Sequence, residues 1–146
     1  MRRAFTLIEL IIVIIIVGIL AAMGISQYSA TVEKSRLAEA KIRIGVMRQL
    51  TYEYYLNKGT LDGIQDPDVG VNNTCSSTNF YRYTVWGTST FLILGAFRCT
   101  SGSGGKTPNA SREYRYFMQY YPGTGQSKWY CDYTDDWSPC FGLPAW

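Results

Sequence analysis

The sequence predicts an α+β protein in which one long N-terminal helix packs on an antiparallel sheet of about four strands. Three observations support this fold class. An almost unbroken apolar run covers Phe5 to Ile25. A helical apolar period continues from there to about Asn57. Beyond Phe80, four short aromatic and β-branched segments alternate with turn residues. An apolar helix stripe and an apolar sheet face each need a partner, so helix on sheet is the economical arrangement.

The apolar run has the length of a membrane span. At roughly 1.5 Å per residue its helix would be about 30 Å long, which matches the hydrocarbon core of a bilayer. Thr6 and Glu9 are its only strongly polar side chains. A helix that is apolar on every face must be surrounded by lipid or by other apolar helices. An ionisable group inside such a helix is expensive, so Glu9 is a functional candidate.

A short basic lead precedes the run. Arg2 and Arg3 predict that the N-terminus stays in the cytoplasm and that everything after Ile25 lies outside. The small residue beside this basic flank, Ala4, comes before the apolar run, where an ordinary secretory signal has its small residues after it. Cleavage between Ala4 and Phe5 would therefore leave the helix on the mature protein.

These residues carry a resemblance. RRA followed by FTLIEL, with Glu9 fifth from Phe5 and Gly18 fourteenth, is similar to the leader and N-terminal helix of type IV pilins and type II secretion pseudopilins. The resemblance implies the type IV pilin fold, cleavage by prepilin peptidase between Ala4 and Phe5, and N-methylation at Phe5. It also implies that Glu9 pairs with the N-terminal amine of a neighbouring subunit during filament assembly.

The chain departs from most relatives at two positions. Ala4 stands where most have glycine, and Ser26 stands where many have proline. Without that proline, helix loosening is expected from Gly18 and Gly24, each by about 1 kcal/mol relative to alanine.

Charge pairing gives Glu9 a physical role in assembly. A methylated ammonium on Phe5 and the Glu9 carboxylate one turn away give each subunit a positive and a negative charge at a similar depth. A neighbouring subunit that is staggered along the axis can form ion pairs with both charges. A lone chain is expected to leave Glu9 unpaired. The alternative is a plain signal anchor in which Glu9 only reaches toward the interface.

The outer half of the helix is predicted to be amphipathic and to stop at Asn57-Lys58-Gly59. Its apolar face is expected to carry Ile42, Val46, Leu50 and Tyr54, widened by Leu37, Ile44, Met47 and Tyr55. The opposite side is expected to carry a basic stripe of Lys34, Lys41 and Arg48. That stripe is either solvated or in contact with acidic groups of neighbouring subunits.

Thr60 to Thr78 predicts a solvated loop rich in Asp, Asn, Gly and Ser. Its carboxylates Asp62, Asp66 and Asp68 lack the spacing of an EF-hand, so no metal site and no cofactor are expected.

An antiparallel meander is predicted after the loop. Its strands are expected at Phe80–Trp86, Phe91–Arg98, Glu113–Tyr121 and Ser127–Tyr133. Gly87-Thr88-Ser89 and Pro122-Gly123-Thr124-Gly125 are the turn signals between neighbouring strands. The tyrosine clusters at 52–55 and 114–121 are expected in the core or in half-buried subunit contacts rather than in an electron-carrying stack.

Four cysteines fall on the side predicted to be outside, where an even count indicates two disulfides with three possible connectivities. Scattered spacing argues against zinc. The resemblance to pilins, many of which close a C-terminal segment with a disulfide, favours Cys131–Cys140 together with Cys75–Cys99.

The predicted organisation has five parts. Residues 1–4 are a leader, 5–25 the hydrophobic transmembrane or filament-core helix, and 26–57 its amphipathic half. Residues 58–79 are a connecting loop, and 80–146 an antiparallel β head whose C-terminal segment is closed by a disulfide.

Composition disfavours an enzyme. The chain has no histidine, the commonest acid/base group and metal ligand, and its net charge of +3 is too small to indicate nucleic-acid binding. Gly104-Gly105-Lys106-Thr107 matches the end of a P-loop, but Thr100 replaces the required first glycine. The sequons at Asn72 and Asn109 are weak signals for glycosylation.

The resemblance therefore implies a structural subunit, a major pilin of a type IV pilus used for adhesion, twitching motility or DNA uptake. The alternatives are a type II secretion pseudopilin and a minor pilin that binds surfaces or DNA. Implied partners are copies of the chain, prepilin peptidase, the inner-membrane assembly platform and the outer-membrane secretin. The precursor is expected in the inner membrane and the mature chain in an extracellular pilus. Nothing in the sequence supports nucleic acid as a partner.

Overall fold

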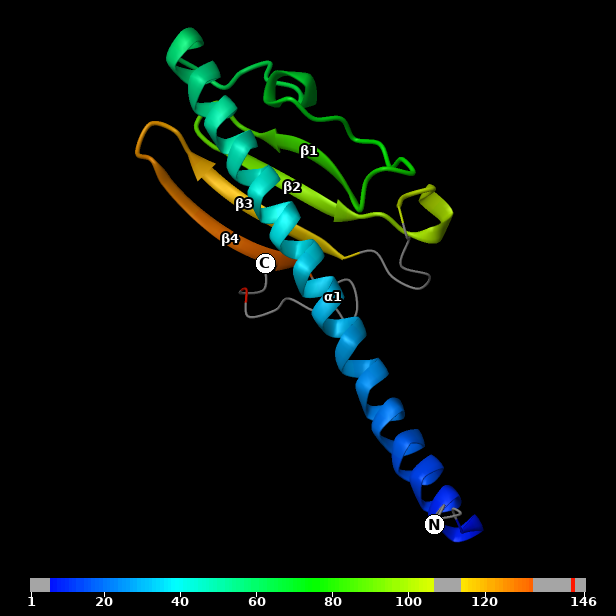
Figure 1. Ribbon diagram of the computed structural model, residues 1–146. Helices are drawn as coiled ribbons and strands as arrows, with labels where there is room; N and C mark the ends of the chain where they lie inside the picture. The colour runs from blue at the N-terminus through cyan, green and yellow to red at the C-terminus, as the bar shows by residue number, and fades with distance from the viewer. Residues whose placement is uncertain (1–5, 107–113, 133–142, 144–146) are drawn as a thin grey trace. The chain divides into compact units, whose positions relative to one another are not determined.

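The computed structural model describes residues 6–106, 114–132 and 143 of the chain (Figure 1). Two compact units divide after Leu37. Helix α1 (Leu7–Lys58) contributes to both. It ends as predicted, because Gly59 takes a left-handed φ of 71° and its N–H donates to the Tyr55 carbonyl at 2.8 Å.

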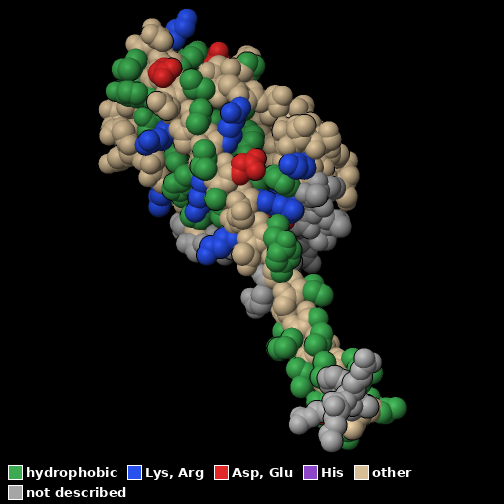
Figure 2. Space-filling model, viewed as in Figure 1, with side chains coloured by type: hydrophobic (Ala, Val, Ile, Leu, Met, Phe, Trp, Pro, Cys, Tyr) green, Lys and Arg blue, Asp and Glu red, His purple; other side chains and the backbone are tan. Residues whose placement is uncertain are grey.

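The first unit contains a helical segment that is long and apolar enough to cross a membrane. Leu7–Ile25 spans 19 residues with a mean hydropathy of 3.0, and none of it is buried. Figure 2 shows its apolar side chains on the molecular surface. The helix is continuous through Gly18 and Gly24. The predicted apolar span is therefore present as a helix with every face uncovered.

The second unit contains the predicted meander. Its strands are β1 (Tyr81–Gly87), β2 (Leu92–Arg98), β3 (Arg115–Tyr121) and β4 (Gln126–Asp132). All neighbours are antiparallel in the order β1-β2-β3-β4, and the register pairs Tyr83 with Ala96, Ala96 with Tyr116, and Tyr116 with Cys131. Residues 88–91 and 122–125 connect the two outer pairs, where the turn signals lie.

The predicted buried face of the outer helix is partly wrong. Ala40, Ile44, Met47 and Thr51 are fully buried, whereas Ile42 is 71% exposed. Val46, at 41%, is also exposed. The buried row follows i, i+4, i+7 and i+11, and it uses small residues where the helix meets the sheet. The Thr51 hydroxyl donates to the Met47 carbonyl at 2.9 Å, so this buried polar group is satisfied.

Two members of the predicted basic stripe, Lys41 and Arg48, do not lie opposite the sheet. The Arg48 guanidinium carbon lies 5.7 Å from the centre of the Tyr120 ring, and Lys41 Nζ lies 6.0 Å from the Trp129 ring. Both cations therefore flank the helix–sheet contact and cover aromatic rings of β3 and β4. This position is favourable because the aliphatic parts of the two side chains pack on the rings while the charged ends reach the surface. A prediction that places every charged residue on the solvent side of the helix misses this arrangement.

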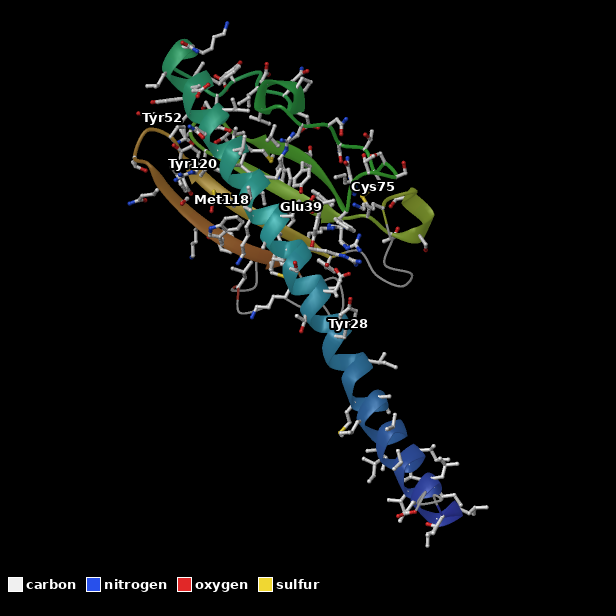
Figure 3. The ribbon with its side chains drawn as sticks, viewed as in Figure 1. Tyr28, Glu39, Tyr52, Cys75, Met118 and Tyr120 are labelled. Carbon is white, nitrogen blue, oxygen red and sulfur yellow. A yellow bond between two sulfur atoms is a disulfide. The ribbon has the colours of Figure 1, made fainter. Side chains whose placement is uncertain are left out.

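The sheet face toward α1 is rich in tyrosine, as expected for core residues. Tyr81, Tyr114 and Tyr116 are buried, and the hydroxyls of Tyr81 and Tyr114 are 3.2 Å apart. The rings of Tyr114 and Tyr116 meet edge to face at 5.4 Å between centroids. Met118 and Tyr120 continue the same face of β3 (Figure 3).

The opposite sheet face carries an aromatic cluster of Trp86, Phe97 and Phe117. Their ring centroids are 5.4–6.0 Å apart. Gly95 lies beneath them, because a Cβ there would lie 2.7 Å from Cζ3 of Trp86 and 2.9 Å from Cε2 of Phe97. Glycine at this position allows the indole to approach the strand backbone closely.

The connecting loop is more structured than predicted. It contains the 3₁₀ turn η1 (Asp66–Val69), and Leu61, Val69 and Val71 are buried. The Val85 N–H donates to the Asp66 carboxylate at 2.7 Å, and the Tyr83 N–H donates to the Asn72 carbonyl at 3.3 Å. The loop thus supplies acceptors to the outer edge of β1, which would otherwise present unpaired donors.

One predicted disulfide is confirmed. Cys75 and Cys99 are joined, with Cα atoms 5.8 Å apart. Cys131 is buried on β4. Its predicted partner Cys140 lies outside the described residues, so the Cys131–Cys140 bridge stays a prediction.

Candidate functional site

Thr6 and Glu9 form a reciprocal cap at the start of α1. The Thr6 backbone N–H and hydroxyl donate to Oε2 of Glu9 at 2.8 Å and 2.7 Å. The Glu9 N–H donates to the Thr6 hydroxyl oxygen at 3.3 Å. This is a capping box, which satisfies donors that the first turn of a helix leaves open.

The cap gives the Glu9 carboxylate hydrogen-bond partners within its own chain, but no positive charge pairs with it among the described residues. Two donors of Thr6 hold the carboxylate, and both reach the same oxygen, Oε2. Within the described residues Oε1 accepts no hydrogen bond. The signal was visible in the sequence as threonine followed three residues later by glutamate before an apolar run.

The other predicted processing residues are only partly described. Ala4 and Phe5, the predicted cleavage and methylation site, lie outside the described residues. Gly18 and Gly24 lie on α1, and a Cβ added at either would meet no atom within 4 Å. Pairing between Phe5 and Glu9 therefore stays a prediction.

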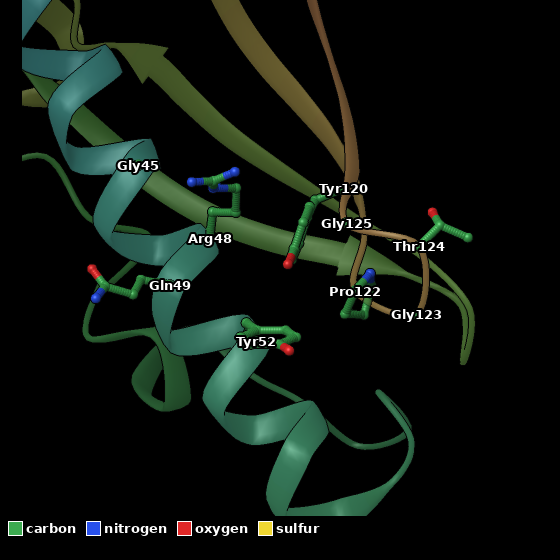
Figure 4. A pocket seen from close by; sticks show the side chains of 9 residues that line it. All are labelled: Gly45, Arg48, Gln49, Tyr52, Tyr120, Pro122, Gly123, Thr124 and Gly125. Atoms are coloured by element: carbon green, nitrogen blue, oxygen red, sulfur yellow. The ribbon is translucent and has the colours of Figure 1, made fainter.

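A groove lies between α1 and the β3–β4 turn (Figure 4). Its volume is about 650 Å³. It is lined by Gly45, Arg48, Gln49, Tyr52, Tyr120, Pro122, Gly123, Thr124 and Gly125. Tyr52 on α1 and Tyr120 on β3 project into the space, and Pro122 borders it on the side of the turn (Figure 4).

Charge in the groove comes from Arg48. Burial raises the pKa of Tyr120 above its ordinary value, and neighbouring Tyr52 reinforces this effect, whereas the positive charge of Arg48 opposes it. Tyr120 therefore stays neutral at physiological pH. The sequence identifies Arg48 and the turn at residues 122–125 separately. No local sequence pattern could predict that these distant parts of the chain line one groove.

Gly105, which belongs to the segment that matches the end of a P-loop, is required for packing. A Cβ at this position would lie 2.2 Å from Cβ of Cys99, so glycine is needed where the chain crosses the disulfide. The Lys106 N–H donates to the Asn79 carbonyl at 2.8 Å, and Lys106 Nζ lies 4.8 Å from the Phe80 ring centre. These contacts fix residues 105 and 106 against the Cys75–Cys99 region.

Loop carboxylates do not form a metal cluster in the part of the chain that the structure describes. Asp66 is engaged by the β1 edge, and Asp68 accepts a hydrogen bond from the Gln65 N–H at 2.8 Å. Both carboxylates thus shape the loop.

Comparison with known proteins finds one family model and several similar relatives. Residues 1–25 match the family model described as a prokaryotic N-terminal methylation motif. The fimbrial protein EcpC of Eikenella corrodens is 45% identical over 58 residues, which cover 40% of this chain and 38% of that protein. The type IV major pilin protein PilE1 of Neisseria gonorrhoeae is 42% identical over 59 residues, covering 40% of this chain and 36% of that protein.

A third relative matches over more residues at a lower identity. The type IV major fimbrial protein FimA of Dichelobacter nodosus is 35% identical over 77 residues, or 53% of this chain and 46% of that protein. The matched region thus spans less than half the length of each of these curated relatives.

Proposed function

We infer that this chain, which belongs to the type IV pilin family, is the major structural subunit of an extracellular helical filament. The names of its relatives, type IV major pilin and fimbrial protein, support this role. The observation that carries it is the uncovered apolar half of α1 with a capped carboxylate in its first turn.

The apolar segment needs a cover that one chain does not provide. None of Leu7–Ile25 is buried, and side chains such as Ile14 and Leu20 are each 60% exposed. Burying each such side chain is worth about 1.5–3 kcal/mol, so exposure of the whole segment to water is prohibitive. Lipid covers it in the precursor, and equivalent helices of other subunits cover it in a filament.

Processing follows from the N-terminal motif. Prepilin peptidase cleaves between Ala4 and Phe5, and the new amine of Phe5 is methylated. Because the cut lies before the apolar helix, the mature subunit retains its means of both membrane insertion and assembly.

Glu9 selects the axial position of a neighbouring subunit. Thr6 already fixes the orientation of the carboxylate through Oε2, and Oε1 is left for the positively charged N-terminal amine of the neighbour. A charge-assisted bond in an apolar filament core is strong only when both partners align, so it sets the stagger between subunits. Repetition of this head-to-tail contact gives open helical growth.

Localisation and partners follow from this cycle. The precursor is a single-pass inner-membrane protein with a cytoplasmic N-terminus, and the assembled chain lies on the cell surface. An inner-membrane assembly platform and an outer-membrane secretin are its expected partners besides other copies.

Electron microscopy and intact-mass analysis of filaments sheared from cells test the proposal. We expect long filaments composed mainly of this chain, starting at a methylated Phe5. If the chain were instead a minor pilin, it would be a trace component of filaments made from another subunit. A chain that keeps Met1 and stays in the membrane would contradict the proposal.

Two variants separate assembly from folding. Glu9→Gln keeps the acceptor geometry of the cap but removes the charge, so we expect loss of filaments with normal membrane levels of the chain. Glu53→Gln removes an exposed charge from the outer part of α1 and should leave filaments unchanged. Normal filaments from Glu9→Gln would disprove the proposed ion pair.

A further inference from the structure

The groove between α1 and the β3–β4 turn has the size and the chemistry of a small-molecule site. Its volume of about 650 Å³ lies within the usual range of ligand pockets, about 300–1,000 Å³. All the residues that line it are described by the structure and belong to the second compact unit. The groove shares no residue with the proposed assembly contact at Thr6 and Glu9.

Arg48 supplies a cation whose N–H donors are not used by the described part of the chain. Within the described residues it forms no ion pair and no hydrogen bond, and its contact is with the Tyr120 ring at 5.7 Å. That contact orients the guanidinium without consuming its N–H groups. A carboxylate is the acceptor that fits the planar donor pair of arginine best.

Aromatic and cyclic side chains give the groove flat walls. Tyr52, which is 42% exposed, faces the groove from α1, while Tyr120 and Pro122 come from β3 and the turn (Figure 4). Neither phenol hydroxyl takes part in a hydrogen bond among the described residues. Each tyrosine therefore offers an apolar ring face together with a polar group that is ready to bind.

A pyranose ring with a carboxylate matches this combination. The C–H faces of a sugar ring pack on aromatic rings, and its hydroxyls bond to groups at their edges. A purely apolar ligand would leave Arg48 desolvated, which is costly. A small carboxylate without a ring would leave the aromatic walls unused.

We propose that the groove binds an acidic saccharide residue, with its carboxylate on Arg48 and its ring against Tyr52 and Tyr120. This assigns to the head a ligand site that goes beyond the proposed filament role. Methyl β-D-glucuronide is the probe, because it contains the ring and the carboxylate and little else.

Binding is measured on the full chain in a zwitterionic detergent that carries no sugar, by calorimetry and by saturation-transfer NMR. A ligand of this size is expected to bind with a Kd of about 1 mM. Methyl β-D-glucoside replaces the carboxylate with a neutral group, and propionate lacks the ring. Both should bind at least about tenfold more weakly, since each loses one of the two recognition elements.

Three variants test the assignment to the groove. Arg48→Gln should weaken glucuronide binding about tenfold or more, because it removes a charge-assisted contact. Lys58→Gln removes the same charge from the exposed last turn of α1 and should leave the Kd unchanged. Gly45→Leu should abolish binding without unfolding the chain, because a Cβ at Gly45 meets no atom within 4 Å and points into open space.

Several outcomes would overturn the proposal. One is that no binding is detected at a glucuronide concentration of about ten times the expected Kd. Another is that the glucoside or propionate binds as tightly as the glucuronide. A third is that Arg48→Gln or Gly45→Leu binds the glucuronide as tightly as the wild type. None of these results bears on filament formation, since the residues concerned are different.

Discussion

Gly95 shows how a single residue shapes the outer sheet face. It lies on the inner strand β2 under Trp86 and Phe97, and the register pairs it with Thr84 and Phe117. Arg82 and Arg115 approach the Phe97 ring at 4.5 Å and 5.3 Å, so two cations border the aromatic cluster. The missing side chain is what makes room for the indole.

Gly95→Ala should therefore be destabilising. A Cβ 2.7 Å from the indole forces Trp86 to move, with an expected cost of about 1–3 kcal/mol. Urea denaturation monitored by tryptophan fluorescence gives the free energy of unfolding and reports on the indole directly. Gly45→Ala is the matched control, since no atom lies near its Cβ position and alanine favours the helix. Equal stability of the two variants would refute the packing argument.

Tyr83 makes stability depend on alkaline pH. Burial raises its pKa, the charge of Glu39 adds to the rise, and Arg43 opposes it. Below the tyrosine pKa of the unfolded chain, about 10, the phenol is neutral in both states, and Tyr83 makes its full contribution to the free energy of unfolding. Above it the unfolded tyrosine ionises first, so stability falls as pH rises toward the folded pKa, by at most about 1.4 kcal/mol per pH unit.

The measurement compares wild type and Tyr83→Phe at pH 8 and pH 11 by urea denaturation. We expect the phenylalanine variant to lose less stability over this interval, because the titrating hydroxyl is gone. Identical pH dependence of the two proteins would show that Tyr83 is not the responsible group.

At the scale of elements, α1 presents two apolar rows, and the sheet selects one of them. Ile44 and Ile42 are two residues apart, yet Ile44 is fully buried and Ile42 is 71% exposed. The chosen row contains Ala40 and Thr51, whose small size allows close approach. The other row, with Ile42 and Val46, stays on the surface of this single chain.

Ile44→Ala and Ile42→Ala form a matched pair. Removing the buried side chain should cost about 2–5 kcal/mol, because it leaves a cavity against the sheet. Ile42→Ala, at the exposed position, should change the free energy of unfolding by less than about 0.5 kcal/mol. Chemical denaturation of both variants measures the difference, and a reversed order would mean that the helix packs through its other face.

At the scale of the whole molecule, the two compact units have different tasks. The described residues from Ala38 on form a core of helix, sheet and disulfide, while Leu7–Ile25 is an apolar helix of which nothing is buried. Gly18 and Gly24 lie within that helix, where glycine lowers helix stability by about 1 kcal/mol per residue relative to alanine.

The double variant Gly18→Ala/Gly24→Ala should make this helix harder to open. Amide hydrogen exchange of residues 18–26 in detergent micelles should slow by roughly 5- to 30-fold, as expected for a gain of 1–2 kcal/mol. Ala22→Gly is the reverse control and should accelerate exchange. Unchanged rates in the double variant would show that these glycines do not loosen the helix.

Local chemistry explains what the sequence predicted well. The apolar span, the stop at Gly59 and the four strands follow from periodicity and turn residues, which act over a few neighbours. The N-terminal motif implied the family, and the comparisons support it. Connectivity of Cys75 with Cys99 came from the resemblance rather than from spacing.

Tertiary structure alone decided the rest. The buried row of α1, the positions of Lys41 and Arg48 over aromatic rings, and the groove that unites Arg48 with Tyr120 depend on which surfaces meet. Two helix faces with similar apolar content differ little in local energy, so the sheet's shape makes the choice. The sequence by itself determined the elements and the apolar helix, because these follow from short-range physics, while long-range packing determined which side chains share a site.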